Sequence, residues 1–414
     1  MGDYFDNLEI RSADQRESEQ LSQLKAQVNL VKLRPYYQHT LANFESSQLN
    51  SLTDLAQLPI TRKSDLPDIQ AGLKPFGGLT TRNPQEFARL FVSPGPISEP
   101  EGFGKDWWRF GRALFAAGFR QGDIVQNCGS YHFTPMGFIM ESAAQALGVA
   151  VIPTGPGQTE RQVQAMAHYQ ATGYAGTPDY LQTILLKAEE LKVSLPQLKY
   201  GLVSAGPYLP SHRQFYQERN LQVVQAYGTA DLGLVAYESP GVNGLILDEQ
   251  VIVEIVRPGS NQPVAFGDVG EVVVTSLNPD YPLIRFAVGD LSKFIPGTSD
   301  CGRTSPRIQG WMGRADQSAK VKGMFVYPKH IAAVVDSLKS VTKGRLIVSR
   351  LDGKDTLKLL LEAPDVLATD ALERAAEIFQ QQCHLRTQVG WVEPDSLAND
   401  GLVIEDNREL EPTN

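Results

Sequence analysis

The segment YPLIRFAVGD, from Tyr281 to Asp290, and the later segment GRADQSAKVKG, from Gly313 to Gly323, decide the fold of this chain. The first is an apolar strand pattern that closes on an acid, and the second opens a new segment with an Arg-Asp turn. An ionised carboxylate accepts hydrogen bonds through two oxygens, which suits the two hydroxyls of a ribose. The pair therefore predicts a nucleotide site beneath a hinged second domain.

Composition limits the classes of protein to consider. The chain has 414 residues, of which 42% are hydrophobic, so it can bury a large core and form roughly two to three domains. A net charge of -9 with scattered Lys and Arg argues against a nucleic-acid partner. The first twenty residues are polar and acidic, and no apolar run reaches membrane length, so we predict a cytoplasmic protein with no membrane partner.

The three cysteines are Cys128, Cys301 and Cys383, which are too few and too far apart for a disulfide framework or a metal knuckle. We expect reduced thiols and no zinc. Cys383 and His384 are adjacent on a predicted helix, so their side chains diverge and cannot form a nucleophile and base.

Short apolar runs alternate with helical patterns in the first half of the chain. A helix is predicted over residues 107–117, a strand over 124–126, a helix over 137–147 and a strand over 149–152. The same rhythm continues through residue 203. Strands separated by helices predict an α/β fold with a mainly parallel sheet covered on both faces.

The pattern changes near residue 235. The runs VIVEIV and GEVVVTSL alternate around turns at Pro258-Gly259 and Gly267-Asp268, which predicts an antiparallel subdomain over about 235–312. Beyond it, strands and two helices predict a small α+β domain. We therefore expect a large N-terminal domain over 1–312 and a small C-terminal domain over 313–414.

Over roughly Leu33 to Arg408 the chain resembles the adenylate-forming enzymes, and within them the phenylacetate-CoA ligase family. The opening pair of segments carries the resemblance, together with LPITRKSDL from Leu58 and the block from Gly122 to Met166. The resemblance implies a large domain of layered sheets and helices with a small mobile α+β domain. It also implies that ATP and a small aryl or acyl carboxylate form an adenylate, which passes to CoA or another acceptor.

The same resemblance implies roles for individual residues. The ring of Tyr227 lies against adenine, where a flat aromatic face is worth about 1 to 3 kcal/mol. Asp290 accepts hydrogen bonds from the ribose, and Arg314 approaches the ribose and phosphate. Asp231 stands where the family holds Mg²⁺ with a glutamate, so Asp231 and Arg314 are the expected catalytic residues. The expected nucleotide and CoA contacts are Ser93, Gly95, Ala205, Gly206, Pro207, Tyr227, Gly228, Thr229, Asp290, Arg314 and Gly323.

Gly323 corresponds to a glycine whose missing side chain lets the pantetheine arm of CoA pass. Tyr131, His132 and Phe133 lie where the family builds the wall for an aryl acid. Aromatic residues at these positions could equally be core between a strand and a helix. The family also implies a possible homodimer.

The chain departs from the family pattern at three places. The family's phosphate loop ends in Lys-Pro, and here Glu99 replaces the lysine within the stretch Ser93 to Pro100. At about 5 Å and an effective dielectric of about 20, a unit charge is worth roughly 3 kcal/mol, so the swap disfavours phosphate. Gly206 replaces a glutamate, and residues 396–406 contain no lysine where the family has its adenylation lysine. Such a loss typically costs on the order of 10²- to 10³-fold in rate.

Two functions remain open at this point. The first is an enzyme that activates a carboxylate as an adenylate. The second is a degenerate homologue that binds a nucleotide, adenylate or carboxylate without efficient ligase activity. The retained contacts concern the base and ribose, whereas the lost contacts concern the triphosphate, so we expect AMP or an acyl-adenylate to bind better than ATP.

Overall fold

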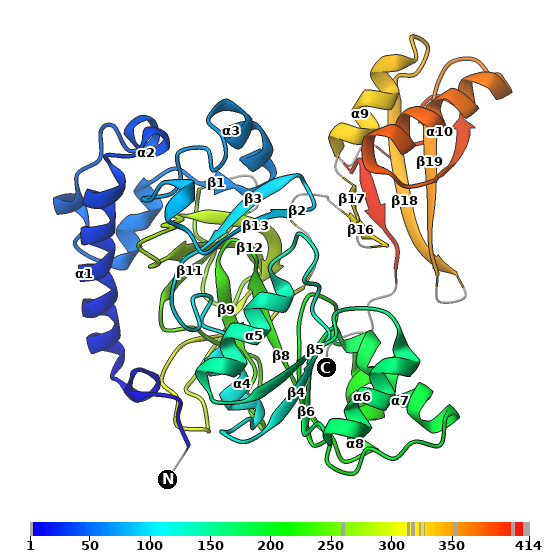
Figure 1. Cartoon of the computed structure of the whole chain (residues 1–414). Coiled ribbons are helices and arrows are strands. Elements are labelled where there is room, and N and C mark those ends of the chain that lie inside the picture. The colour runs from blue at the N-terminus through cyan, green and yellow to red at the C-terminus, as the bar shows by residue number, and fades with distance from the viewer. Residues whose placement is uncertain are drawn as a thin grey trace. The chain divides into compact units, whose positions relative to one another are not determined.

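The computed structural model describes residues 3–257, 261–312, 315, 319–322, 324–326, 328–351, 354–398 and 402–408. The chain divides into two compact units. Unit 1 comprises Met1–Gly313 with Thr413–Asn414, and unit 2 comprises Arg314–Pro412. Each unit has its own hydrophobic core and is described by itself (Figure 1).

A nine-stranded sheet forms the centre of unit 1, in the order β14-β15-β10-β9-β8-β7-β6-β4-β5. Strands β5, β4, β6, β7 and β8 are parallel, and the remaining strands pair antiparallel. The strands are β4 (Ile124–Asn127), β5 (Ala150–Pro153), β6 (Gly173–Gly176), β7 (Tyr200–Val203), β8 (Gln222–Thr229), β9 (Gly233–Tyr237), β10 (Leu245–Leu247), β14 (Phe294–Ile295) and β15 (Arg307–Ile308).

Helices cover both faces of the parallel strands (Figure 1). On one face lie α4 (Gly111–Ala117) and α5 (Met136–Ala146), which share a core with Val125, Ala175 and Leu202 of the strands. On the other face lie α6 (Thr159–Tyr169), α7 (Pro178–Glu190) and α8 (Pro210–Gln217), which pack against Tyr174 and Val203. The central strands β4, β6 and β7 bury both faces, whereas the edge strand β5 is partly exposed.

The strand order reverses direction at β4. The connection from β4 places β5 on one side of it, and the connection from β5 returns across β4 to place β6 on the other side. In open α/β sheets such a reversal leaves a crevice outside the carboxyl ends of the strands, where ligands bind. The carboxyl ends of the parallel strands are therefore the first place to seek a site.

A second sheet of unit 1 has four strands in the order β1-β13-β12-β11, and a separate hairpin is formed by β2 and β3. These strands are β1 (Thr61–Arg62), β2 (Arg89–Ser93), β3 (Ile97–Glu101), β11 (Val251–Val256), β12 (Gly270–Ser276) and β13 (Phe286–Ser292). Helix α1 (Ala13–Val31) buries Leu24, Val28 and Val31 in the core that this sheet shares. Shorter helices of this region are α2 (Pro35–Thr40), α3 (Leu66–Gly72), η1 (Asn7–Ile10), η2 (Ser46–Gln48), η3 (Leu52–Gln57), η4 (Lys63–Asp65) and η5 (Pro84–Glu86).

Unit 2 is a small α+β body with a four-stranded sheet in the order β20-β19-β18-β21 and a hairpin of β16 and β17. Its helices bury Ile331, Ala375 and Phe379 against the sheet. The elements are β16 (Ala319–Val321), β17 (Met324–Val326), α9 (Pro328–Ser337), β18 (Lys343–Leu351), β19 (Lys354–Glu362), α10 (Thr369–Cys383), β20 (Gln388–Val392) and β21 (Ile404–Asp406).

The predicted α/β class with its parallel sheet is confirmed, and two local details differ. Helix α4 begins at Gly111 rather than at residue 107, because Arg109 has a φ of 66° and cannot belong to a right-handed helix. The strands of residues 235–312 are shared between two sheets. Among the described residues, no helix combines the length and apolar character needed to cross a membrane.

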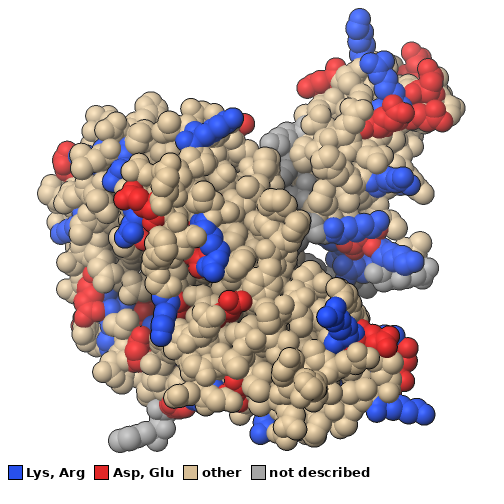
Figure 2. Space-filling model, viewed as in Figure 1, with Lys and Arg blue, Asp and Glu red and all other residues tan. Residues whose placement is uncertain are grey.

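The surface drawn in Figure 2 mixes both signs of charge. Acidic and basic side chains alternate over this face with uncharged residues between them. Several arginines are instead buried and tie the N-terminal segment to the sheets. The carboxylate of Glu249, with a side chain only 1% exposed, accepts from Arg11 and Arg16, each at 2.9 Å.

Removing the charge of Glu249 should destabilise unit 1. Glu249→Gln leaves the buried guanidinium of Arg16 without its anion and Arg11 with only the half-exposed Glu19, and breaking such a buried pair typically costs about 3 to 5 kcal/mol. We expect a clear loss of unfolding free energy in urea denaturation. The matched control is Glu19→Gln, because Glu19 pairs with the same Arg11 but is 39% exposed. The control should change the unfolding free energy by less than about 1 kcal/mol, and equal losses in both variants would contradict this account.

Candidate functional site

The residues predicted from the sequence gather at the carboxyl ends of the parallel strands. Tyr131 to Phe133 follow β4, Ala205 to Pro207 follow β7, and Tyr227 to Thr229 end β8. The turn of Ala205, Gly206 and Pro207 is exposed. Ala205 has a φ of 60°, so the backbone makes a left-handed turn at this residue. Since the crevice of the sheet opens at this edge, these loops surround one candidate site.

Asp290 lies on β13 and is 7% exposed. Its Oδ2 accepts a hydrogen bond from the Tyr227 hydroxyl at 2.9 Å, and its Oδ1 accepts from the Trp311 indole nitrogen at 3.1 Å. Two neutral donors thus contact the carboxylate, one at each oxygen, and help to fix its orientation. The sequence placed Tyr227 and Asp290 in one site, and the structure brings their side chains into contact.

A β-bulge directs Tyr227 toward Asp290. The pairing of β8 with β9 shifts register between Tyr227 and Gly228, and such bulges re-aim side chains beside functional sites. Gly228 is required here, because a Cβ would lie 2.5 Å from the Gly233 carbonyl oxygen and 2.9 Å from the Phe110 ring. Beyond Gly228, the Thr229 hydroxyl accepts the Leu232 N–H at 3.1 Å and closes the turn that carries Asp231.

The stretch from Ser93 to Pro100 is a β-hairpin. Its strands pair from Ser93 with Ile97 to Arg89 with Glu101, so only Pro94, Gly95 and Pro96 form the turn. The Ser93 hydroxyl donates to the carboxyl of Glu99 across the hairpin. Glu99 is 1% exposed and therefore points into the protein. The residue that replaces the expected lysine is thus held within the base of the hairpin.

Glu99 meets a second carboxyl group, that of Asp231, within hydrogen-bonding reach. Asp231 is 3% exposed, and its Oδ2 accepts from the ammonium group of Lys63 on η4. Burial, and then the negative charge of Asp231, raises the pKa of Glu99 from 4.5 to about 8, although Lys63 and Ser93 oppose the rise. The buried hydroxyl of Tyr281 lies near both acids, which together with its burial raise its pKa. We call Lys63, Ser93, Glu99, Asp231 and Tyr281 the hairpin cluster.

The arrangement of the hairpin cluster determines whether Asp231 can hold the expected metal ion. Mg²⁺ requires ionised oxygen ligands. Here the ammonium of Lys63 already neutralises Asp231, and the neighbouring Glu99 favours its protonated form. These residues, as arranged, do not fit a magnesium ion. Within the described ranges, no group of three or more His, Cys, Asp or Glu side chains is placed to hold a metal.

The three residues predicted to form the acid-binding wall differ in their exposure to solvent. Tyr131 is partly buried, its hydroxyl donates to Glu141 Oε2 at 2.8 Å and accepts from the Asn127 amide at 2.7 Å, and its ring meets Phe138 edge-on. Burial and the Glu141 carboxylate raise the pKa of Tyr131. His132 and Phe133 are exposed, and Phe133 is 67% accessible to solvent. Tyr131 is therefore fixed in place, whereas the next two side chains face outward.

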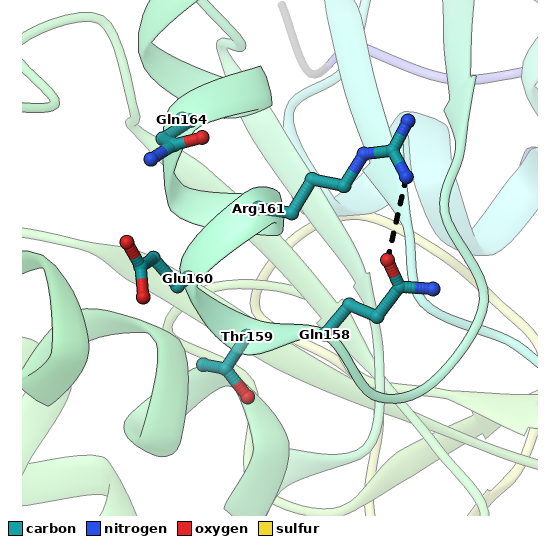
Figure 3. A pocket seen from close by; sticks show the side chains of 5 residues that line it. All are labelled: Gln158, Thr159, Glu160, Arg161 and Gln164. Atoms are coloured by element: carbon teal, nitrogen blue, oxygen red, sulfur yellow. Dashed lines mark hydrogen bonds between the residues drawn. The ribbon is translucent and has the colours of Figure 1, made fainter.

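A hollow of about 440 Å³ lies elsewhere on the same edge, at the start of α6 (Figure 3). The side chain of Arg161 donates to Gln158 at 3.4 Å across it. The lining residues are Gln158, Thr159, Glu160, Arg161 and Gln164, and they mix both charges. None of the residues predicted from the sequence lines this hollow.

Unit 2 contains three further residues named in the sequence analysis: Arg314, Gly323 and Arg408. Arg314 and Gly323 lie outside the described residues. Arg408, a possible substitute for the missing lysine, pairs with Asp355 at 3.0 Å and also with Asp406. These two carboxylates raise the pKa of Arg408. The Cys301 thiol and the Ser299 hydroxyl form a hydrogen bond of 3.0 Å, and either group can donate.

Sequence reasoning missed two residues of the site. Lys63 belongs to the segment LPITRKSDL, which was used only to recognise the family. Trp311 lies two residues before the segment GRADQSAKVKG. A buried carboxylate such as that of Asp231 needs a cationic partner, and Lys63 in the motif LPITRKSDL was the one sequence signal for that partner. Trp311 carried no such signal, because its contact with Asp290 depends on the backbone pairing of Met312 N–H with the Leu291 carbonyl at 2.9 Å.

Known proteins are similar to this chain in sequence and in structure. The sequence model of the family described as "AMP-binding enzyme" matches residues 109–278. The chain is 29% identical to a phenylacetate-coenzyme A ligase of Thermus thermophilus, covering 87% of this chain and 84% of that one. It is 26% identical to that of Escherichia coli K12, covering 96% and 94%.

The solved structure of 2-hydroxyisobutyryl-CoA ligase, in complex with 2-HIB-AMP and CoA, is also similar. It is 26% identical, has a TM-score of 0.82 and covers 98% of this chain and 92% of its own. The predicted adenylate-forming fold is confirmed by these matches. Within that class, the chain is similar to phenylacetate-CoA ligases over most of its length, as its sequence predicted.

The raised pKa of Glu99 predicts how stability depends on pH. A carboxyl whose folded pKa is about 8 and whose ordinary value is 4.5 favours the folded state below pH 4.5. That contribution is lost as the pH rises from 4.5 to about 8. The unfolding free energy should therefore fall over this window, by on the order of a few kcal/mol, in urea titrations at several pH values.

The variant Glu99→Gln isolates this contribution, because an amide can donate to Asp231 and accept from Ser93 without titrating. It should lack the fall over the same window. The control Glu160→Gln changes an exposed glutamate of the same unit and should keep the wild-type profile. A Glu99→Gln profile parallel to the wild type would contradict the raised pKa.

Proposed function

We propose that this protein activates a small aryl or acyl carboxylic acid with ATP and transfers the acyl group to CoA or another acceptor. In the first step a carboxylate oxygen attacks the α-phosphorus of ATP, and pyrophosphate leaves. In the second step the acceptor attacks the acyl carbon of the adenylate, and AMP leaves. The observation that carries the proposal is the Tyr227–Asp290 contact, at the carboxyl edge of a fold shared with a ligase described in complex with 2-HIB-AMP and CoA.

The geometry supports the nucleoside part of this proposal. The carboxylate of Asp290 is oriented by Tyr227 and Trp311, which supports its proposed role as acceptor of the ribose hydroxyls. The exposed turn of Ala205 to Pro207 offers backbone groups at the neighbouring strand end. Tyr227 presents an aromatic face beside them for the adenine.

The acid would bind on the β4 side of the site. Tyr131 is held by Asn127 and Glu141, which gives a rigid edge to the proposed acid pocket. A rigid aromatic wall with few polar groups suits a small aryl or acyl group. Unit 2 would supply Arg314 and Gly323 as a mobile second domain, over 313–414. Homodimer formation and magnesium binding with the ATP phosphates stay predictions of the family resemblance.

A second candidate function is binding of AMP or an adenylate without efficient ligation. The observation that favours it is the hairpin, in which Glu99 replaces a phosphate-binding lysine and two prolines remove backbone donors. Such a protein would keep the contacts to base and ribose. It would lack the contacts that bind the β- and γ-phosphates.

Carboxylate-dependent exchange of pyrophosphate into ATP tests the enzymatic proposal. Across a panel of aryl and acyl acids, at least one acid should give exchange above background. Asp290→Ala should reduce it by on the order of 10²-fold, because the ribose loses its oriented acceptor. Asp300→Ala removes an exposed aspartate of the same unit and should leave exchange unchanged. Silence across the whole panel with a folded protein would reject the ligase.

Calorimetry with AMP and ATP separates the two candidates further. The hairpin predicts that AMP binds more tightly than ATP, by about tenfold, because Glu99 stands in place of a phosphate-binding lysine and the prolines of the turn remove backbone donors. Glu99→Lys should reverse this order by restoring a cation. Tighter binding of ATP to the wild-type protein would contradict the prediction.

A further inference from the structure

Two side chains hold the hydroxyl of Tyr131, and they also decide what this residue can offer to a ligand. The hydroxyl donates to Glu141 Oε2 at 2.8 Å, on α5, and accepts from the Asn127 amide nitrogen at 2.7 Å, at the end of β4. The same amide nitrogen donates to the Gly137 carbonyl at 2.7 Å. A tyrosine hydroxyl has one proton and an asparagine amide has two. Each side-chain proton of this pair is therefore already given to an acceptor of the protein.

The ring of Tyr131 is held in place together with its hydroxyl. A Cβ added to Gly137 would lie 2.7 Å from atoms of the ring, so glycine in the first turn of α5 permits this close approach. The Phe138 ring meets it edge-on, with centroids 5.0 Å apart. Asn127 is 0% exposed, and its Oδ1 accepts the Gly129 N–H at 3.0 Å, which fixes the loop that carries Tyr131. The hydroxyl can turn toward a ligand only by breaking these buried contacts.

The polar groups around the Tyr131 hydroxyl favour acceptors over donors. Glu141 is a carboxylate whose second oxygen accepts from Gln145 at 3.3 Å, one turn further along α5. A second carboxyl group, that of Glu101, lies near Glu141 and pairs with Arg89 at 2.7 Å. The charge of this arginine is therefore balanced by Glu101. Tyr131 thus presents ring carbon and oxygen lone pairs to a ligand, and its proton stays with Glu141.

We propose that Glu141 determines the acid specificity of the site by taking the proton of Tyr131. The inference rests on the proposed function, in which Tyr131 forms part of the wall for the acid. Glu141 acts through Tyr131 and is a positioning residue. A wall without a free donor packs well against hydrocarbon, but it cannot replace the water that an acceptor atom loses on burial. The site therefore takes acids with hydrocarbon tails and discriminates against tails of equal size that carry an oxygen or nitrogen acceptor.

Pairs of acids with nearly the same shape measure this discrimination. Suitable pairs are phenylacetate with 4-pyridylacetate, benzoate with isonicotinate, and 4-methylpentanoate with 4-oxopentanoate. In pyrophosphate exchange, at a pH that keeps the pyridine neutral, kcat/KM should favour the hydrocarbon member of a pair by about ten- to a hundredfold. Equal kcat/KM values for the two members would overturn the inference.

Removing the acceptor of the Tyr131 proton should change the selectivity as well as the rate. In Glu141→Met the hydroxyl keeps its bond from Asn127, and its proton becomes available to an acceptor atom of the acid. The ratio of kcat/KM within a pair should shift toward the acceptor-bearing acid by about tenfold. A structural loss alone would lower both kcat/KM values together and leave the ratio unchanged, and that result would reject the role of Glu141.

The variant Tyr131→Phe tests whether Glu141 acts through the hydroxyl. Phenylalanine keeps a hydrocarbon wall, so the ratio should stay near the wild-type ratio whatever the rate. The double variant of Tyr131→Phe with Glu141→Met should show the ratio of Tyr131→Phe, because it has no hydroxyl proton to release. A shift in the double variant as large as that of Glu141→Met would contradict this route.

The matched control is Gln145→Met, which makes the same kind of change on the same helix. Gln145 is exposed and its hydrogen bond goes to Glu141, so the bond from Tyr131 to Glu141 stays in place. This control should keep the wild-type ratio, and urea denaturation of each variant checks that folded proteins are compared. A shift in the control like that of Glu141→Met would reject a specific role for Glu141.

The exchange assay separates failure of this inference from failure of the proposed function. Silence of the folded wild-type protein with every acid of the panel would reject the ligase, and the inference with it. Exchange only with acids whose tails carry acceptor atoms would reject the inference and leave the proposed function intact.

Discussion

A buried carboxylate must be neutralised, and this constraint shapes the candidate site. Asp231 is held by Lys63 of a distant segment, and Asp290 is held by neutral donors from Tyr227 and Trp311. The two acids therefore have different surroundings. Asp290 is contacted by a hydroxyl and an indole N–H, whereas Asp231 is paired with an ammonium group. That difference is consistent with separate roles for the two acids in the proposed site.

The scaffold explains why these residues meet. The parallel strands β4, β6, β7 and β8 end on one edge, and the reversal of strand order at β4 opens that edge. The bulge at Tyr227 and the close approach of Gly228 to Gly233 then turn the last strand toward β13 of the second sheet. Residues far apart in the sequence, on β8 and β13, thereby share one hydrogen bond. The position of the site is a property of the topology, and its chemistry is a property of a few side chains.

Much of this could be predicted from the sequence, for reasons that the residues make plain. Continuous apolar runs such as VIVEIV marked the strands, and the acid of YPLIRFAVGD marked the site, because both signals are local. The hairpin at Ser93 was expected only as a loop, since two prolines hide the strand pattern of β3. The environment of Glu99 was out of reach, because its neighbours Lys63 and Asp231 come from other parts of the chain. Sequence alone identified the substitution but not the buried surroundings of Glu99.

Trp311 gives the site an optical property of its own. Its indole nitrogen donates to Asp290 while the side chain remains 39% exposed, whereas Trp108 is buried in the core. Indole emission responds to hydrogen bonding and to the polarity around the ring. A hydroxyl that competes for Asp290 would change both for Trp311 and neither for Trp108. The protein thus carries an intrinsic fluorophore hydrogen-bonded to Asp290, and occupancy of the proposed ribose site can be followed in real time without a label.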